Sequence, residues 1–215
     1  AVFVRLPDGG MEPAAADEIA QAVRRFRAGG KKVYAHSQGL YASGVVTSTY
    51  AVGASADEFW MQPGAPFEAT GISISDMFLK RAFDRYGVKA EFEQRAEFKN
   101  AVNPYLHDDY TPAHKEAQLS WMNAILDSTL AAAAKDRGLQ PQVLRAAITA
   151  GPYDAAGAMA KGLINRLGQV HEAEAAALKT AGDGSELVDF TEYQPTFSHS
   201  TVGGGDTVAV IGAEG

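Results

Sequence analysis

Lys99 is the residue whose type and surroundings could most readily support chemistry. It follows the alternating run 90–95, Ala-Glu-Phe-Glu-Gln-Arg, which predicts a strand, and it precedes a turn or helix start at Asn103-Pro104. A lysine at such a place is ordinarily a solvated surface charge. It can act as a base near neutral pH if burial disfavours its charged form. The apolar neighbours Phe98 and Val102 favour that burial, provided that the nearby glutamates face away.

A lysine base needs a hydroxyl to activate, and two serines are candidates. Ser43 and Ser48 lie in a stretch that carries no charged residue from 37 to 56. A serine hydroxyl becomes an effective nucleophile when a base takes its proton. Either hydroxyl could instead bond to the preceding helical turn. The backbone N–H groups of Gly9-Gly10, in a turn after a short apolar run, are candidates to stabilise an oxyanion, although a plain tight turn has the same sequence.

Composition narrows the classes of function. The chain has 215 residues, a net charge of −7 and no cysteine, which excludes disulfides, thiolate-bound metal and a cysteine nucleophile. Because lysine and arginine form no long run, nucleic acid is not an expected partner. No apolar run approaches the roughly 20 residues that cross a membrane. The histidines show no metal-ligand spacing, so we expect no metal and no other cofactor.

The pattern of apolar residues predicts an α/β fold. Short connections join the predicted strand 1–6, helix 13–28, strand 31–35, uncharged buried helix 45–56 and strand 57–61. Repeated strand–helix–strand units imply a parallel sheet. Further helices are predicted at 76–86, 110–137, 140–149 and 170–179. In the longest of these, Thr111-Pro112 makes a good cap and first residue.

The composition changes at Gly182, which predicts a domain boundary. We expect one domain over residues 1–181 and a glycine-containing linker over 182–206. The run 207–215 begins with Thr-Val-Ala-Val-Ile and predicts the first strand of a following domain that is truncated here.

One motif resembles that of a known family. The stretch 98–105, Phe-Lys-Asn-Ala-Val-Asn-Pro-Tyr, is followed at 107–112 by His-Asp-Asp-Tyr-Thr-Pro. Together they resemble the motif of the signal peptide peptidase A family, which are serine peptidases with a Ser/Lys dyad. Three further features occur in the same order as in that family. They are the Pro7-Asp8-Gly9-Gly10 turn, the strand 56–60 and the Gly-Leu-Ile step at 162–164. The likeness covers about residues 1–177 and is strongest to the N-terminal half of the long tandem form.

The resemblance implies a fold of the ClpP/crotonase type, built of stacked βαβ units, and no cofactor. It implies Lys99 as the general base and the apolar cores of cleaved signal peptides as substrates. It also implies a homo-oligomeric, tetramer-like ring at the extracytoplasmic face of the bacterial inner membrane. Membrane association would come from a segment outside this chain.

The family's nucleophile motif, Ser-Gly-Gly-aromatic, is not matched here. Val45-Val46 follow Ser43-Gly44, and counting back from Ala56-Asp57 places Thr47 at the nucleophile position, with Ser48 one residue off. In the tandem form the lysine comes from the N-terminal half and the serine from the C-terminal half. We therefore expect the serine beyond residue 215, with Ser43 and Ser48 as alternatives.

Two other functions fit the same predicted fold. A crotonase-like acyl-CoA hydratase or isomerase would stabilise a thioester enolate with paired backbone N–H groups and would not need Lys99. A non-catalytic assembly module would need neither the paired backbone N–H groups nor Lys99.

Overall fold

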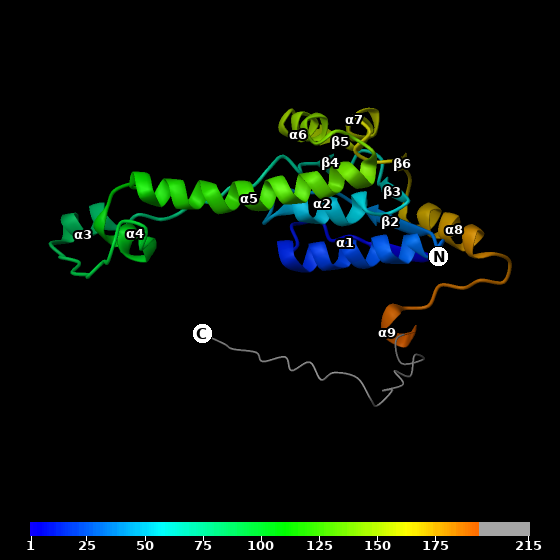
Figure 1. Cartoon of the computed structure of the whole chain (residues 1–215), viewed down its shortest axis with the longest axis horizontal. Coiled ribbons are helices and arrows are strands. Elements are labelled where there is room, and N and C mark those ends of the chain that lie inside the picture. The colour runs from blue at the N-terminus through cyan, green and yellow to red at the C-terminus, as the bar shows by residue number, and fades with distance from the viewer. Residues whose placement is uncertain (194–215) are drawn as a thin grey trace.

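A parallel four-stranded sheet with helices on both faces forms the body of the molecule (Figure 1). The computed structural model describes residues 1–193. The strand order is β1-β2-β3-β6, with all neighbours parallel; the strands are β1 (Val2–Arg5), β2 (Val33–Ser37), β3 (Glu58–Met61) and β6 (Arg166–Leu167). The predicted α/β class, with a parallel sheet built of βαβ units, is confirmed.

The central strand β2 is buried at every residue because both of its faces are covered. Tyr34 and His36 face helix α8 (Val170–Ala181), where the Tyr34 hydroxyl lies 2.7 Å from Thr180 Oγ1. The alternate residues Val33 and Ala35 point to the other face and join the apolar core. That face is covered by α1 (Pro13–Ala28) and α2 (Val46–Ala54).

Helix α2 is the centre of the core. All nine of its residues are buried between α1, the sheet and α5 (Pro112–Arg137), which explains why this segment carries no charge. Gly53 allows the close approach of α2 to β3, because a Cβ there would lie 2.6 Å from the ring of Phe59.

The remaining elements of the body are a second small sheet and three further helices. A small antiparallel sheet pairs β4 (Pro66–Phe67) with β5 (Tyr153–Asp154). Further helices are α6 (Pro141–Thr149), α7 (Ala155–Ala160) and α9 (Phe190–Tyr193). Helix α8 ends at Ala181, where the domain was predicted to end, and α9 lies in the predicted linker. The predicted strand 207–215 lies outside the described residues.

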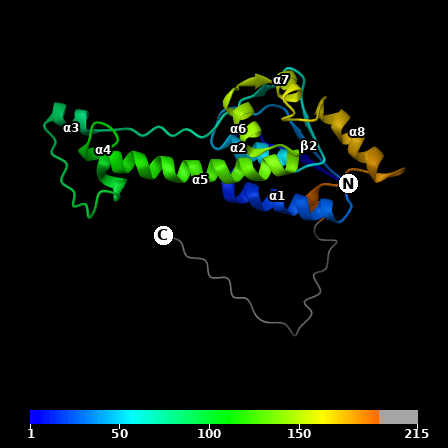
Figure 2. The same cartoon turned by 45° about the horizontal axis from the view of Figure 1, so that its top comes forward.

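Helix α5 extends well beyond the body (Figures 1 and 2). It has 26 residues, so it is about 39 Å long. As predicted, Thr111 caps it by accepting a hydrogen bond from the His114 N–H. Its buried residues near the C-terminal end are Leu130, Ala133 and Ala134, which pack in the core.

The N-terminal end of α5 carries an arm, defined here as residues 71–110 (Figure 2). The arm contains α3 (Lys80–Tyr86), the 3-10 helix η1 (Asn100–Val102) and α4 (Asn103–Leu106). Helix α3 is shorter than the predicted 76–86. The predicted strand 90–95 is wrong: the segment has no regular secondary structure. It lies away from the sheet, and Phe92 stacks on Tyr105 with ring centroids 5.3 Å apart.

Among the helices of residues 1–193, none has the length and apolar character needed to cross a membrane.

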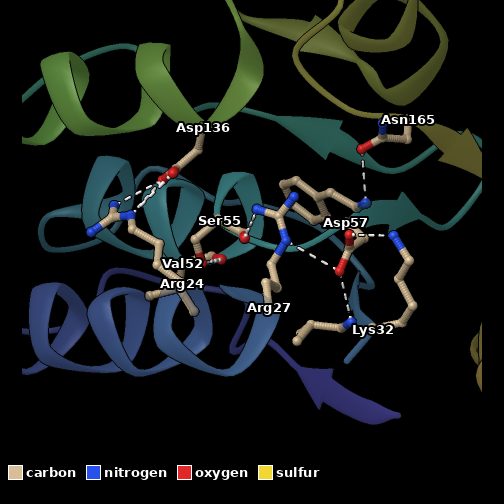
Figure 3. A network of polar contacts seen from close by, with 10 residues as sticks. Arg24, Arg27, Lys32, Val52, Ser55, Asp57, Asp136 and Asn165 are labelled. Atoms are coloured by element: carbon tan, nitrogen blue, oxygen red, sulfur yellow. Dashed lines mark hydrogen bonds and ion pairs between the residues drawn. The ribbon is translucent and has the colours of Figure 1, made fainter. Parts of the chain in front are cut away.

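Asp57 joins the ends of several elements in a polar network (Figure 3). Its carboxylate accepts hydrogen bonds from the Val33 N–H at 2.9 Å and from Lys32 Nζ at 3.0 Å. It also forms an ion pair with Arg27 of α1 at 3.1 Å. Arg27 in turn donates to the carbonyl of Ser55, which follows α2. One carboxylate thus ties α1 and the end of α2 to the starts of β2 and β3.

A second ion pair fixes α5 to α1. Both carboxylate oxygens of Asp136 accept from the Arg24 guanidinium at 2.8–3.0 Å, and the Asp136 side chain is only 7% exposed. This paired geometry holds the C-terminal half of α5 on the body.

We expect Asp57→Asn to destabilise the protein by about 1–2 kcal/mol at pH 7, because charge-assisted hydrogen bonds are lost. Burial raises the pKa of Asp57, but the Val33 N–H, Lys32 and Arg27 together outweigh burial and hold that pKa below its ordinary value of 3.8. The stabilisation is therefore present above about pH 4 and is lost as pH falls through the lower folded pKa.

Urea unfolding of the wild type and of Asp57→Asn at pH 7 and pH 3 checks this. The difference in unfolding free energy should be smaller at pH 3. An equal difference at both pH values would contradict the expectation. Asp183→Asn, at an exposed position, serves as the control.

Candidate active site

Lys99 lies in the arm, at the residue that precedes η1, and its side chain is exposed. The Lys99 N–H donates to the Ala96 carbonyl at 3.3 Å, and the Lys99 carbonyl accepts from Gln94 Nε2 at 2.6 Å. The expected end of a strand is therefore replaced by a tight turn. The neighbouring Phe98 is 51% exposed, so the described part of the chain does not by itself bury the amine.

The turn that presents Lys99 is conformationally strained. Ala96 has φ = 66°, and it is the one non-glycine residue within 1–193 that has a positive φ. The left-handed conformation costs an alanine roughly 1 kcal/mol. Strain of this kind persists only where surrounding contacts hold it, and such contacts are present at Lys99.

Ser48 and Thr47 are enclosed in the core. Ser48 is 1% exposed and lies beside Thr129 and Ala132 of α5, and its hydroxyl has no hydrogen-bond partner within the described residues. Thr47 is fully buried and its hydroxyl likewise has no partner there. Neither hydroxyl can reach a substrate without opening of the core.

Ser43 is exposed, in the loop that leads into α2. Its carbonyl accepts from the Gly10 N–H at 2.7 Å, and its Oγ lies where a Cβ on Gly9 would come within 2.3 Å. The glycines are therefore needed for close contact between two loops. Because the Gly10 N–H is already bonded, it is not available to an oxyanion in this conformation.

The hydroxyl of Thr49, which gives no signal in the sequence, fixes the Gly9-Gly10 loop to α2. Thr49 Oγ1 accepts from the Met11 N–H at 3.0 Å and donates to the Gly9 carbonyl at 2.7 Å. Because its hydroxyl accepts a hydrogen bond from the backbone and donates one to it, Thr49 is a structural residue. The start of α2 thus holds the Gly9-Gly10 turn in place.

A hollow lies where the arm leaves the body. Its lining comes from the loop before α2 and from the chain after β4: Ala42, Gly44, Val46, Glu68, Thr70, Gly71, Ile72 and Ser73. Glu68 shapes it, since its carboxylate accepts from the Ala42 N–H at 2.8 Å. Open α/β sheets bind ligands at such loop edges, but Lys99 does not line this hollow.

The structure does not bring Lys99 together with Ser48. Ser48 lies beside Thr129, whereas the Lys99 turn is bonded through Asn103 to Thr111, at the other end of α5. Thr129 lies 18 positions after Thr111, which corresponds to about 27 Å along the helix. Figures 1 and 2 agree in placing α3 and α4 at the end of α5 remote from α2.

The histidine on the central strand is structural. His36 is buried, and its Nε2 lies 3.0 Å from the Gly168 carbonyl. Burial lowers the pKa of His36, and this effect outweighs the hydrogen bond to Gly168. Within residues 1–193, no cluster of three or more histidine, aspartate or glutamate side chains could hold a metal ion.

Comparison with known proteins identifies the class. The sequence model of peptidase family S49 matches residues 25–182. The chain therefore carries a peptidase-family domain, and it belongs to peptidase family S49. This confirms the expected serine-peptidase family.

Relatives that share the sequence are proteins called Protease 4. The chain is 27% identical over 210 residues to Protease 4 of Salmonella typhi, covering 92% of this chain and 33% of the relative. It is 23% identical over 131 residues to Protease 4 of Haemophilus influenzae, covering 61% of this chain and 20% of the relative. The chain thus spans a third or less of the length of these relatives.

A solved structure of a peptidase from Plasmodium falciparum superposes with a TM-score of 0.41 at 9% identity, covering 78% of each chain. A likeness of this degree carries no statement about activity.

In the full-length protein, we expect Ser43→Ala and Ser48→Ala to keep the wild-type rate of peptide hydrolysis. Ser48→Ala should leave the unfolding free energy unchanged or raise it by up to about 1 kcal/mol, since it removes a buried hydroxyl that lacks a partner. Steady-state kinetics and urea unfolding check both. Loss of turnover in either variant, with the fold intact, would make that serine the nucleophile.

Proposed function

We propose that this chain is the base-donating half of a composite serine endopeptidase, in which Lys99 takes a proton from a serine supplied by another domain. The observation that carries the proposal is the place of Lys99. It is exposed in the arm, in a turn bonded to the N-terminal end of α5, while the hydroxyls of Thr47 and Ser48 are enclosed in the core of the body. Membership of family S49 and the motif around Lys99 support the same reading.

The arm offers the means to desolvate the amine. Apolar side chains exposed in or next to the arm are Ile74, Met77, Tyr86, Val88, Phe92, Phe98, Tyr105, Leu119 and Trp121. A protein surface that docks here would remove water from this region. Burial favours the neutral amine of a lysine, which is the form that accepts the serine proton. The serine then attacks the peptide carbonyl, the peptide C–N bond breaks as the protonated lysine gives its proton to the departing amine, and water hydrolyses the resulting acyl-enzyme.

The proposed substrates are the apolar segments of cleaved signal peptides, which match an active site bordered by exposed apolar groups. The proposed assembly is a ring-like homo-oligomer at the extracytoplasmic face of the bacterial inner membrane, attached through a segment outside this sequence. Both Protease 4 relatives come from bacteria, which supports the bacterial part of this setting.

No observation favours a crotonase-like acyl-CoA activity. That chemistry needs two backbone N–H groups free to face a thioester oxygen. In the loop where such a pair was expected, the Gly10 N–H is bonded to the Ser43 carbonyl.

We expect Lys99→Arg and Lys99→Ala in the full-length protein each to lower kcat for an apolar peptide by at least about 10³-fold, a loss typical for removal of a general base. Arginine keeps the positive charge but does not deprotonate in proteins, so it separates a base from a binding cation. Both variants should fold, since the Lys99 side chain is exposed.

Lys89→Arg is the matched control, because Lys89 is an exposed lysine of the same arm that pairs with Glu91. It should turn over substrate at the wild-type rate. Normal turnover by Lys99→Arg would rule out the base, and the chain would then be an assembly module or an enzyme of another kind.

A further inference from the structure

Both backbone polar groups of Lys99 are held by the chain around it. Its N–H donates to the Ala96 carbonyl, and its carbonyl accepts from Gln94 Nε2 at 2.6 Å. Gln94 thus closes a loop of six residues onto itself with its side chain. The strained φ of Ala96 lies inside this loop, so the conformation is one that the contacts must maintain.

The same side chain connects Lys99 to a buried amide. Gln94 Nε2 also donates to Asn103 Oδ1 at 3.2 Å. Asn103 is 1% exposed although the arm around it is largely in solvent. Its own amide donates to Asn100 Oδ1 at 3.3 Å and to Thr111 Oγ1 at 3.4 Å. Both donor hydrogens and the oxygen of this amide are therefore satisfied.

Thr111 completes the connection to the body. It caps α5, where its Oγ1 also accepts from the His114 N–H at 3.2 Å. A continuous series of hydrogen bonds therefore runs from the Lys99 carbonyl through Gln94 and Asn103 to the first turn of α5. Helix α5 is itself anchored to α1 by the ion pair of Asp136.

Burial does not hold this loop. Residues 91–99 are all exposed and have no regular secondary structure, and η1 and α3 contain no buried residue. An exposed segment with so little apolar contact would otherwise sample many conformations. The stacking of Phe92 on Tyr105 holds one side of the segment, and the amide network restricts the turn at Lys99.

We propose that Gln94 and Asn103 are positioning residues for Lys99, and that they orient its turn on the end of α5. This inference rests on the proposed role of Lys99 as the base. A base must lie within hydrogen-bond reach of the proton that it removes. A displacement of about 1 Å can lower the rate by about 100-fold.

The decisive variant is Gln94→Met in the full-length protein. Methionine is similar in length and uncharged, and it cannot donate to the Lys99 carbonyl. Because Gln94 is exposed, the protein should still fold. We expect kcat for an apolar peptide to fall by about 10- to 100-fold, with KM and the urea unfolding midpoint little changed. Asn103→Ala should lower kcat similarly.

Gln142→Met, at an exposed glutamine of α6, is the matched control and should behave as wild type. In the Lys99→Ala background, Gln94→Met should cause no further loss of the residual rate, since it acts only through the lysine. Unchanged kcat for Gln94→Met, or an added loss in the Lys99→Ala background, would overturn the inference.

The failures of the two proposals differ. If Lys99→Arg retains turnover, the proposed function itself fails, whatever Gln94→Met does. If Lys99→Arg is inactive but Gln94→Met turns over normally, only the positioning role fails.

Discussion

The structure depends on one helix that is packed at one end and extended at the other. The C-terminal half of α5 is held by Leu130, Ala133 and Ala134 in the core and by the ion pair of Asp136 with Arg24. Its N-terminal half extends beyond the sheet and carries the arm (Figure 1). Because a helix of 26 residues is stiff over about 39 Å, the position of the arm follows from the packing of the body.

The two ends of α5 also differ in the reactive groups that lie beside them. In the body, the hydroxyls of α2 are buried: Ser48 is enclosed between α2 and α5, and Thr49 holds the Gly9-Gly10 turn. Ser43, in the loop before α2, is exposed. The arm does the reverse and exposes Lys99 among apolar groups. A helix α2 whose hydroxyls are enclosed and an arm with an accessible lysine are complementary features. They make sense together if the arm meets a second domain.

The sequence predicted the body better than the arm, for a physical reason. In the body, the sequence pattern follows burial and local capping. The uncharged run 45–56 therefore predicts the buried helix α2 correctly, and Thr111-Pro112 predicts the start of α5 correctly. In the arm, the alternation at 90–95 predicts a strand, which is wrong, because alternation does not show whether a neighbouring strand exists. The burial of Asn103 left no signal either, since an asparagine before a proline is equally typical of an exposed helix start. The motif points to Lys99, but its relation to Gln94 and Thr111 is visible only in the folded structure.

The most direct test of the composite site is a structure of the full-length protein with its nucleophilic serine acylated by a serine-directed inhibitor. The account predicts that the modified serine belongs to a domain beyond this chain. It also predicts that Lys99 Nζ lies within hydrogen-bond reach of that serine's Oγ, about 2.6–3.2 Å. Acylation of Ser43 or Ser48, or a different base at that distance with Lys99 in solvent, would contradict it.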